Sequence, residues 1–147
     1  MPADELTMRG QTVSGGTEKL NFGGRTPGYG YHITEFFLYP STLNSDFECC
    51  GTVTAGKTSV NPLTPNFDDP GLIATGFMGT SASQPYPVKL QWVINDLFVI
   101  TQDLILSVTD SSSNTSPVNW HCKFKRVKLS TAAEAVANFN QFTIFDD

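Results

Sequence analysis

The sequence contains few charged residues and no long apolar segment. Charged residues account for 16% of the chain, and 14 acidic residues outnumber 9 basic ones, which gives a net charge of −5. A nucleic-acid-binding surface normally requires a basic face, so this composition argues against nucleic acid as a partner. No apolar run approaches the roughly 18 residues of a membrane-spanning helix, so no membrane span is expected.

The first residues, MPADELTMRGQ, lack the basic and apolar regions of a secretion signal, so we expect folding in a reducing cytoplasm. The chain has 3 cysteines, and no CxxC motif is present. Cys49 and Cys50 are adjacent, whereas Cys122 is far away in the sequence. This number and spacing favour buried free thiols over a disulfide framework or a zinc site.

Residue patterns for catalysis are equally scarce. The only histidines are His32 and His121, and no G-x-S-x-G motif marks a serine nucleophile. Asp68 and Asp69 lack the further acidic ligands of a calcium loop, and the GKT sequence at Gly56 lacks the first glycine of a phosphate-binding loop. We therefore predict no catalytic residues, no metal site and no cofactor. An enzyme would need a pocket in which His32 or His121 meets a carboxylate.

The chain is rich instead in aromatic residues, with 11 Phe, 4 Tyr and 2 Trp. Such side chains are typical of strands and cores. With 39% hydrophobic residues over 147 positions, the chain is long enough to bury the core of one domain.

Residues 1–29 differ from the remainder because they are rich in glycine and small polar residues. This composition is typical of irregular chain, either a disordered leader or an arm that becomes ordered against a partner. Leu20 and Phe22 predict a short strand over 18–22 and a point of attachment. The arm is the favoured interpretation.

From residue 30 the apolar residues follow a period of two, which predicts strands. In residues 31–40, Phe36 and Leu38 lie on one face of the expected strand, and four apolar residues lie on the other, so both faces are expected to be covered. Those four are Tyr31, Ile33, Phe37 and Tyr39. Residues 46–56 alternate in the manner of a half-buried strand. Further strands are predicted over 72–78, 88–94, 97–100 and 103–109.

Two connections stand out between these strands. Residues 56–71 contain 3 prolines and no clear period, which predicts a long loop of the kind that often carries function. Asn95 and Asp96 predict a tight turn, so residues 88–94 and 97–100 are expected to form a hairpin.

The segment WHCKFKRVKL at 120–129 predicts another strand. Its inward residues are expected to be Trp120, Cys122 and Phe124, and its outward residues His121, Lys123 and Lys125. Val127 and Leu129 are expected to face inward beyond a bulge near Lys125 and Arg126. The basic side chains form either a solvated sheet face or a docking edge for an acidic partner.

The C-terminal region contains the only helical pattern. Thr131 and Glu134 have the spacing of a capping box, in which Thr131 caps the helix and Glu134 reaches back. The last residues, FTIFDD at 142–147, are expected to form a final strand or a docking segment.

Together these features predict an all-β fold of seven or eight strands, a single β-sandwich or jelly-roll-like barrel. Residues 1–29 form an extended, partly flexible N-terminal arm in this interpretation. Residues 30–147 form the sandwich domain, with one short C-terminal helix and a tail.

Two segments carry a resemblance to a known class of proteins: LNFGGRTPGYGYHITEFFLYPS at 20–41 and ITQDLILSVTDSSSNTSPVNWHCKFKRVKL at 100–129. With the glycine-rich leader and the acidic sandwich, they resemble small structural proteins of tailed bacteriophage particles, especially capsid decoration (cement) proteins. The resemblance implies a non-enzymatic virion protein, made in the host cytoplasm, that stabilises the head shell by binding the major capsid protein. Its copies would be homo-oligomeric or lattice-bound, and neither nucleic acid nor a membrane would be a partner.

Partner contacts are expected at apolar residues of the arm, at outward lysines and at aromatic residues of the tail. These are Leu6, Met8, Leu20, Phe22, Lys123, Lys125, Phe142 and Phe145. The alternative function is a tail-associated or carbohydrate- or receptor-binding sandwich, in which exposed aromatic rings stack on sugars. The candidate rings are Tyr29, Tyr31, Tyr39, Tyr86 and Trp92.

Overall fold

The computed structural model describes residues 4–22, 27–43, 46–56, 60–80, 89–110, 116–133 and 135–137. Eight strands are assigned within these ranges. They are β1 (Glu5–Thr12), β2 (Thr17–Leu20), β3 (Tyr29–Pro40), β4 (Phe47–Ala55), β5 (Leu72–Thr80), β6 (Lys89–Ile94), β7 (Leu104–Asp110) and β8 (Val118–Lys128).

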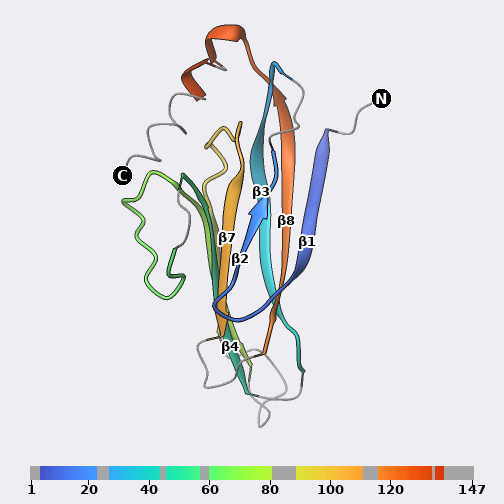
Figure 1. Cartoon of the computed structure of the whole chain (residues 1–147), viewed down its shortest axis with the longest axis vertical. Helices are drawn as coiled ribbons and strands as arrows, with labels where there is room; N and C mark the ends of the chain where they lie inside the picture. Colours follow the sequence, from blue (N-terminus) through green and yellow to red (C-terminus); the bar gives the residue numbers. More distant parts are fainter. Residues whose placement is uncertain are drawn as a thin grey trace.

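The strands form two antiparallel sheets that pack face to face, as an all-β sandwich (Figure 1). The smaller sheet has the order β1-β8-β3, and the larger has the order β2-β7-β4-β5-β6. The first half of the chain folds back on the second, so β1 pairs with β8, β2 with β7 and β4 with β5. This pairing follows the jelly-roll pattern, except that β6 joins the larger sheet beside β5.

The core lies between the sheets because apolar residues alternate inward along their strands. Phe36 and Phe124 from the smaller sheet meet Leu106 and Val53 from the larger one, all four at most 1% exposed. Full burial of one such side chain contributes about 1.5 to 3 kcal/mol. The inward positions predicted for Trp120, Cys122 and Phe124 are confirmed.

The segment expected to be an arm contributes one strand to each sheet. Residues 5–12 form β1 and pair with β8 over their whole length. Residues 17–20 form β2, close to the strand predicted over 18–22. Described residues 5–22 are therefore hydrogen-bonded parts of the sandwich, and β1 was not anticipated from the sequence.

The bulge lies on β3, which corrects its expected position near Lys125 and Arg126. The pairing of β3 with β8 shifts between Ile33 and Glu35, and the extra residue, Thr34, donates a hydroxyl hydrogen bond to the Lys123 carbonyl (3.1 Å). The shift reverses the alternation along β3. Ile33 faces the core as expected, but the outward residues beyond the bulge, Phe37 and Tyr39, are exposed rather than covered.

Strand β4 is buried on both faces, whereas the sequence predicted a half-buried strand. Cys49 and Val53 face the core, and the outward residues Thr52 and Thr54 are at most 1% exposed. The reason is position, because β4 lies at the centre of the five-stranded sheet between β7 and β5. A small hydroxyl side chain there is shielded by neighbouring strands.

Residues 97–100 do not pair with β6, so the predicted hairpin is wrong. Asn95 does make the expected turn, since its side-chain oxygen accepts a hydrogen bond from the Leu97 N–H (3.2 Å). The chain then crosses to the other sheet, where Ile100 forms an isolated bridge with Tyr31 of β3. The bridge links the two layers along one side of the sandwich.

The proline-containing loop has local structure in its described part, residues 60–71. Asn61, Asn66 and Asp69 each accept a hydrogen bond from the backbone N–H two residues further along, at 3.0, 3.0 and 2.9 Å. These side chains replace backbone partners that a strand would have supplied. The loop is therefore held in a defined shape beside β5.

Helical residues follow β8 at 131–133 and 135–137, which confirms a short helix near the C-terminus. The helix cap is Ser130 rather than the expected Thr131, because the Ser130 hydroxyl accepts a hydrogen bond from the Ala133 N–H (3.1 Å). Glu134 and the segment 142–147 lie outside the described residues. In the described part of the chain, no helix is long and apolar enough to cross a membrane.

All three cysteines are buried free thiols, as the sequence predicted. Burial raises the pKa of Cys122 and of Cys49 from 9.0 to about 12. Burial, with a further contribution from Glu48, raises the pKa of Cys50 to about 11. Thiols that remain protonated are poor nucleophiles.

We expect the native thiols to resist a thiol-reactive dye at pH 8 and to react once the chain is unfolded in urea. Stability should also fall as the pH rises above about 9, because the unfolded thiols ionise first; the limiting slope is about 1.4 kcal/mol per pH unit for each thiol. Urea titrations from pH 8 to 11 measure this slope. Cys122→Ala should make it shallower, and an unchanged slope would contradict the assignment.

Removing residues 1–12 should destabilise the sandwich rather than release a dispensable arm. The truncation leaves the β8 edge unpaired and removes Leu6 and Met8 from the core, which we expect to cost about 3 kcal/mol or more. Circular dichroism melting and light scattering would report a lower midpoint and aggregation. A midpoint equal to that of the full chain would show that β1 is dispensable for folding.

Candidate binding surfaces

The outer face of the smaller sheet brings together aromatic and polar side chains from three strands. Strand register places Arg9, His121 and Phe37 in one cross-strand row, and Gln11, Asn119 and Tyr39 in the next. We call these six residues the aromatic face. They border an open depression of about 690 Å³ at the end of the sheet where β1 and β3 finish and β8 begins.

Contacts between neighbours hold the aromatic face in place. The ring of His121 stacks on Phe37 with centroids 5.9 Å apart. Gln11 donates an amide hydrogen bond to the Asn119 carbonyl oxygen (2.9 Å), and Asn119 in turn donates to the Pro40 carbonyl (3.3 Å). Phe37 and Tyr39 nevertheless remain 41% and 57% exposed, so the surface is ordered and accessible.

Two tryptophans support this surface from within the sandwich, and each lies across a glycine on the adjacent strand. Trp120 pairs with Gly10, and its indole N–H donates to the Thr12 hydroxyl (2.9 Å). Trp92 pairs with Gly76 and packs edge-on against Phe37, with ring centroids 6.1 Å apart. A Cβ at Gly76 would overlap the indole of Trp92, whereas a Cβ at Gly10 would only crowd that of Trp120.

The two histidines of the chain have different surroundings. Among the described residues that line the depression there is no Asp or Glu beside His121. The other histidine, His32, makes a hydrogen bond through Nδ1 with the Phe98 carbonyl (3.1 Å). In the part of the chain that the structure describes, no three potential metal ligands gather.

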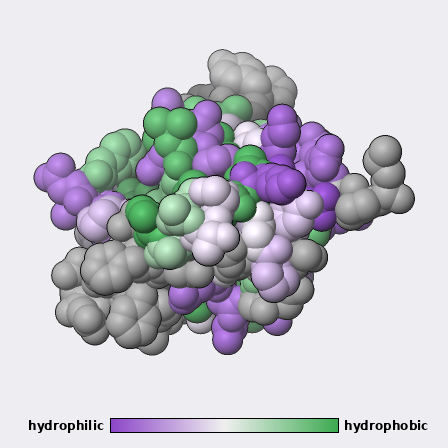
Figure 2. All heavy atoms as spheres, turned by 90° about the horizontal axis from the view of Figure 1, so that it is seen from above, coloured by the Kyte–Doolittle hydropathy of each residue, from purple (hydrophilic) through white to green (hydrophobic). Residues whose placement is uncertain are grey.

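The smaller sheet also concentrates the basic residues of an acidic chain. Strands β1, β3 and β8 contain five of the 9 Lys and Arg residues but only two of the 14 Asp and Glu residues. Their net charge is therefore +3, and the remainder of the chain carries −8. Viewed from the end of the sandwich, strongly hydrophilic residues gather on the side where β1 and β8 lie (Figure 2).

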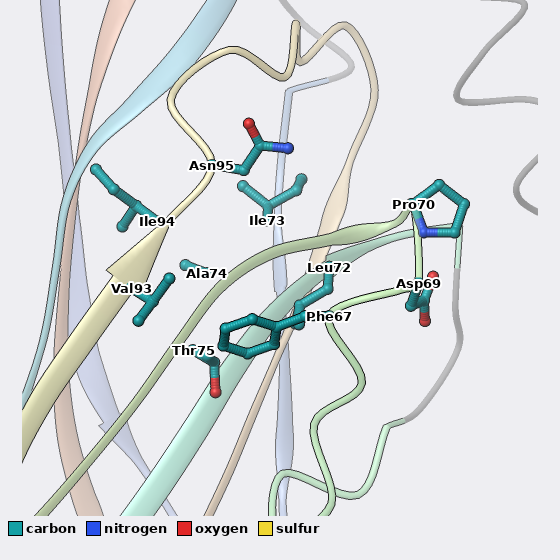
Figure 3. A pocket seen from close by; sticks show the side chains of 10 residues that line it. All are labelled: Phe67, Asp69, Pro70, Leu72, Ile73, Ala74, Thr75, Val93, Ile94 and Asn95. Atoms are coloured by element: carbon teal, nitrogen blue, oxygen red, sulfur yellow. The ribbon is translucent and has the colours of Figure 1, made fainter.

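A second candidate surface lies on the larger sheet, between the 60–71 loop and the paired strands β5 and β6 (Figure 3). We call it the apolar groove, and its volume is about 220 Å³. Its lining residues are Phe67, Asp69, Pro70, Leu72, Ile73, Ala74, Thr75, Val93, Ile94 and Asn95. The Asp69 turn described above fixes the loop at one side of the groove.

Large apolar side chains are exposed around this groove. Phe67 is 66% exposed and Val93 is 38% exposed. Phe77, 43% exposed, lies diagonally across β5 and β6 from Val93, since Phe77 pairs with Gln91. Single exposed apolar residues are common, but a cluster beside a groove is typical of an interaction surface.

The residues that were predicted to contact a partner differ in their exposure, and two of them are buried. Leu20 and Phe22 are 3% and 2% exposed and belong to the core, so they are not available to a partner in this fold. Asp103 fixes that segment by accepting a hydrogen bond from the Phe22 N–H (2.6 Å) and pairing with Lys19 (3.2 Å). This corrects the expectation of a partner contact at both apolar residues.

The remaining predicted residues do not form one cluster. Leu6 and Met8 are half-buried against the core. Lys123 and Lys125 project outward from β8 as expected, and the Lys123 amine lies 3.7 Å from the Glu5 carboxylate. Phe142 and Phe145, in the tail, lie outside the described residues, as does Tyr86, one of the candidate stacking rings.

Arg9, Gln11 and Asn119 were not among the residues predicted to form a site. The signal for the first two was present, since in ELTMRGQT the apolar Leu6 and Met8 alternate with polar residues. That alternation predicts a strand with Arg9 and Gln11 on its outer face. Nothing in the local sequence around Asn119 indicated that it would lie beside them.

Gly76→Ala should disturb the support of the aromatic face. The added Cβ would lie 2.8 Å from Cζ3 of Trp92, so the ring must move, and we expect a loss of about 1 to 3 kcal/mol. Urea unfolding monitored by tryptophan fluorescence measures the loss. Gly10→Ala is the comparison, because its Cβ would lie 3.0 Å from Trp120 and should cost less. Equal midpoints for both variants and the parent chain would contradict the packing argument.

The two surfaces differ in chemistry. The aromatic face combines exposed rings with amide and guanidinium groups, whereas the apolar groove is bordered by exposed hydrophobic side chains. No protein-family model and no curated protein matches the chain.

Proposed function

We propose that the protein is a non-enzymatic structural protein of a virus particle, of the capsid decoration type, which attaches to the major capsid protein. The observation that carries the proposal is the exposure of Phe67, Phe77 and Val93 around the apolar groove. Apolar side chains of this size, exposed together on a sheet and on the loop beside it, favour a protein partner that covers them.

The energetics of such a contact favour attachment through the groove. The loop that carries Phe67 is held by its own side-chain hydrogen bonds, and the other two residues project from paired strands. Little conformational entropy is therefore lost when a partner binds. Aromatic side chains that become fully desolvated at an interface are those whose truncation costs most, about 2 kcal/mol or more each.

The jelly-roll pairing of the strands also supports a virion protein. Jelly-roll sandwiches occur in viral capsid domains and in lectins, and one fold serves many functions. The proposal therefore also draws on the resemblance of residues 20–41 and 100–129 to decoration proteins. On a capsid lattice, many copies of a weak contact would act together through a high effective concentration.

The proposal predicts that purified virus particles from the source of the sequence contain this chain in many copies. Recombinant protein should bind particles that lack it. Phe67→Ser with Val93→Ser, which replaces two side chains that line the groove, should weaken binding about 30-fold or more, because loss of the aromatic anchor alone costs about 2 kcal/mol. Co-sedimentation with particles measures the affinity.

Leu97→Ser is the matched control. Leu97 is 82% exposed but does not line the groove, so its substitution should leave binding unchanged. Circular dichroism should show that all variants remain folded. Absence of the chain from purified particles would contradict the virion role, and full binding by the double variant would contradict attachment through the groove.

The alternative, a tail-associated or carbohydrate- or receptor-binding module, is favoured by a different observation. The exposed ring of Tyr39 lies beside the hydrogen-bonded amides of Gln11 and Asn119. Rings and fixed amides in one depression are suited to a small polar ligand rather than to a broad protein surface. This site lies on the other sheet, so it does not compete with the groove for the same residues.

A further inference from the structure

We infer that the aromatic face is a binding site for an acidic polysaccharide, one whose sugar rings carry carboxylates. This goes beyond attachment to a capsid and does not depend on it, because the aromatic face and the apolar groove share no residue. The inference rests on the rings, the amides and the charge of the face.

The exposed rings supply an apolar surface for the C–H face of a sugar. Tyr39 is 57% exposed, and it lies two residues from Phe37 on the same side of β3. Phe37 is fixed between His121 and Trp92, with ring centroids 5.9 and 6.1 Å away. A rigid aromatic surface of this kind loses little entropy when it is covered.

The amides supply hydrogen-bonding groups in a fixed orientation next to the rings. Gln11 is exposed and uses one amide N–H to bond Asn119, and its amide has a second N–H and a carbonyl oxygen with which to bind a ligand. Sugar hydroxyls both donate and accept hydrogen bonds, so an oriented amide matches them. The row of Gln11, Asn119 and Tyr39 thus places an amide pair and a ring side by side.

The charge distribution favours an acidic sugar over a neutral one. Arg9 is exposed on the edge strand, in the same row as His121, and guanidinium groups bind carboxylates through two parallel hydrogen bonds. Strands β1, β3 and β8 carry a net charge of +3, whereas the remainder of the chain carries −8. An anionic polymer would be repelled by the rest of the molecule and attracted to this sheet.

An acidic surface on a second copy of the chain is the competing occupant, and size decides against it. The depression of about 690 Å³ has the size of a small-ligand site, for which about 300 to 1,000 Å³ is usual. A stable protein contact needs about 800 Å² on each partner, which six residues around a depression do not supply. A short stretch of polysaccharide fits both the volume and the charge.

The test is affinity electrophoresis of the full chain through gels that contain polygalacturonate, alginate or hyaluronan. Fully methyl-esterified polygalacturonate is the matched neutral probe, because it keeps the rings and removes the charge. We expect retardation by at least one acidic polymer and at least tenfold weaker binding to the methyl ester. Tyr39→Ala should weaken binding to both forms about tenfold, whereas Arg9→Ala should remove the preference for the acidic form.

Lys125→Ala is the control, since it removes the same charge from the same sheet but outside the aromatic face. A local site predicts a smaller loss of binding for Lys125→Ala than for Arg9→Ala, whereas attraction by the overall charge of the sheet alone predicts equal losses and would overturn the inference. Light scattering of the same samples detects self-association. No binding to any of the three polymers, or oligomers that Arg9→Ala dissociates, would also overturn it. Neither result bears on the presence of the chain in virus particles, which is tested separately.

Discussion

The pairing of β8 with both β1 and β3 is the interaction on which the rest of the structure depends. Strand β8 is the middle strand of the smaller sheet, and its partners begin at residues 5 and 29, far from it in the sequence. Without this long-range pairing the smaller sheet would not form, and Trp120 and Phe124 could not pack against the larger sheet. The pairing also aligns the outward residues of three strands in rows, so the same hydrogen-bond ladder that closes the core creates the aromatic face.

The two tryptophan–glycine pairs connect the interior of the sandwich with that surface. Trp120 extends over Gly10 toward the edge strand, and Trp92 extends over Gly76 toward the edge of β3. Trp92 contacts the ring of buried Phe36 as well as that of exposed Phe37, with centroids 6.5 and 6.1 Å away. Because interiors are closely packed, a change in the core position of Trp92 is transmitted to the ring that it supports outside.

Sequence periodicity predicted what depends on local alternation and failed where partners are distant. The inward and outward residues of 120–124 followed from period two alone. The bulge at Thr34 could not be located in this way, because it reverses an alternation on one strand and is visible only against the register of the other. The candidate site could not be predicted for the same reason. Phe37 and His121 were each placed on a strand, but only the pairing of β8 with β1 and β3 brings Arg9 beside them. Strand β1 was not predicted because the glycine-rich composition of residues 1–29 is typical of irregular chain, although ELTMRGQT itself alternates with a period of two.

The sandwich separates the two candidate surfaces in a way that permits both to be occupied at once. In the larger sheet, Val53 and Ala74 face the core, so Phe77 and Val93 project from the opposite, outer face. The aromatic face is the outer face of the other sheet, and the whole core lies between them. A protein attached through the apolar groove would therefore present its basic, aromatic surface away from the attachment site. The segregation of charge adds to this arrangement, since the −8 carried by the remainder of the chain would turn an anionic polymer toward the sheet that carries +3. When many copies are attached to a capsid lattice, each copy would add one outward-facing binding site. The weak contacts of these sites with one long polymer would then add up to a higher overall affinity.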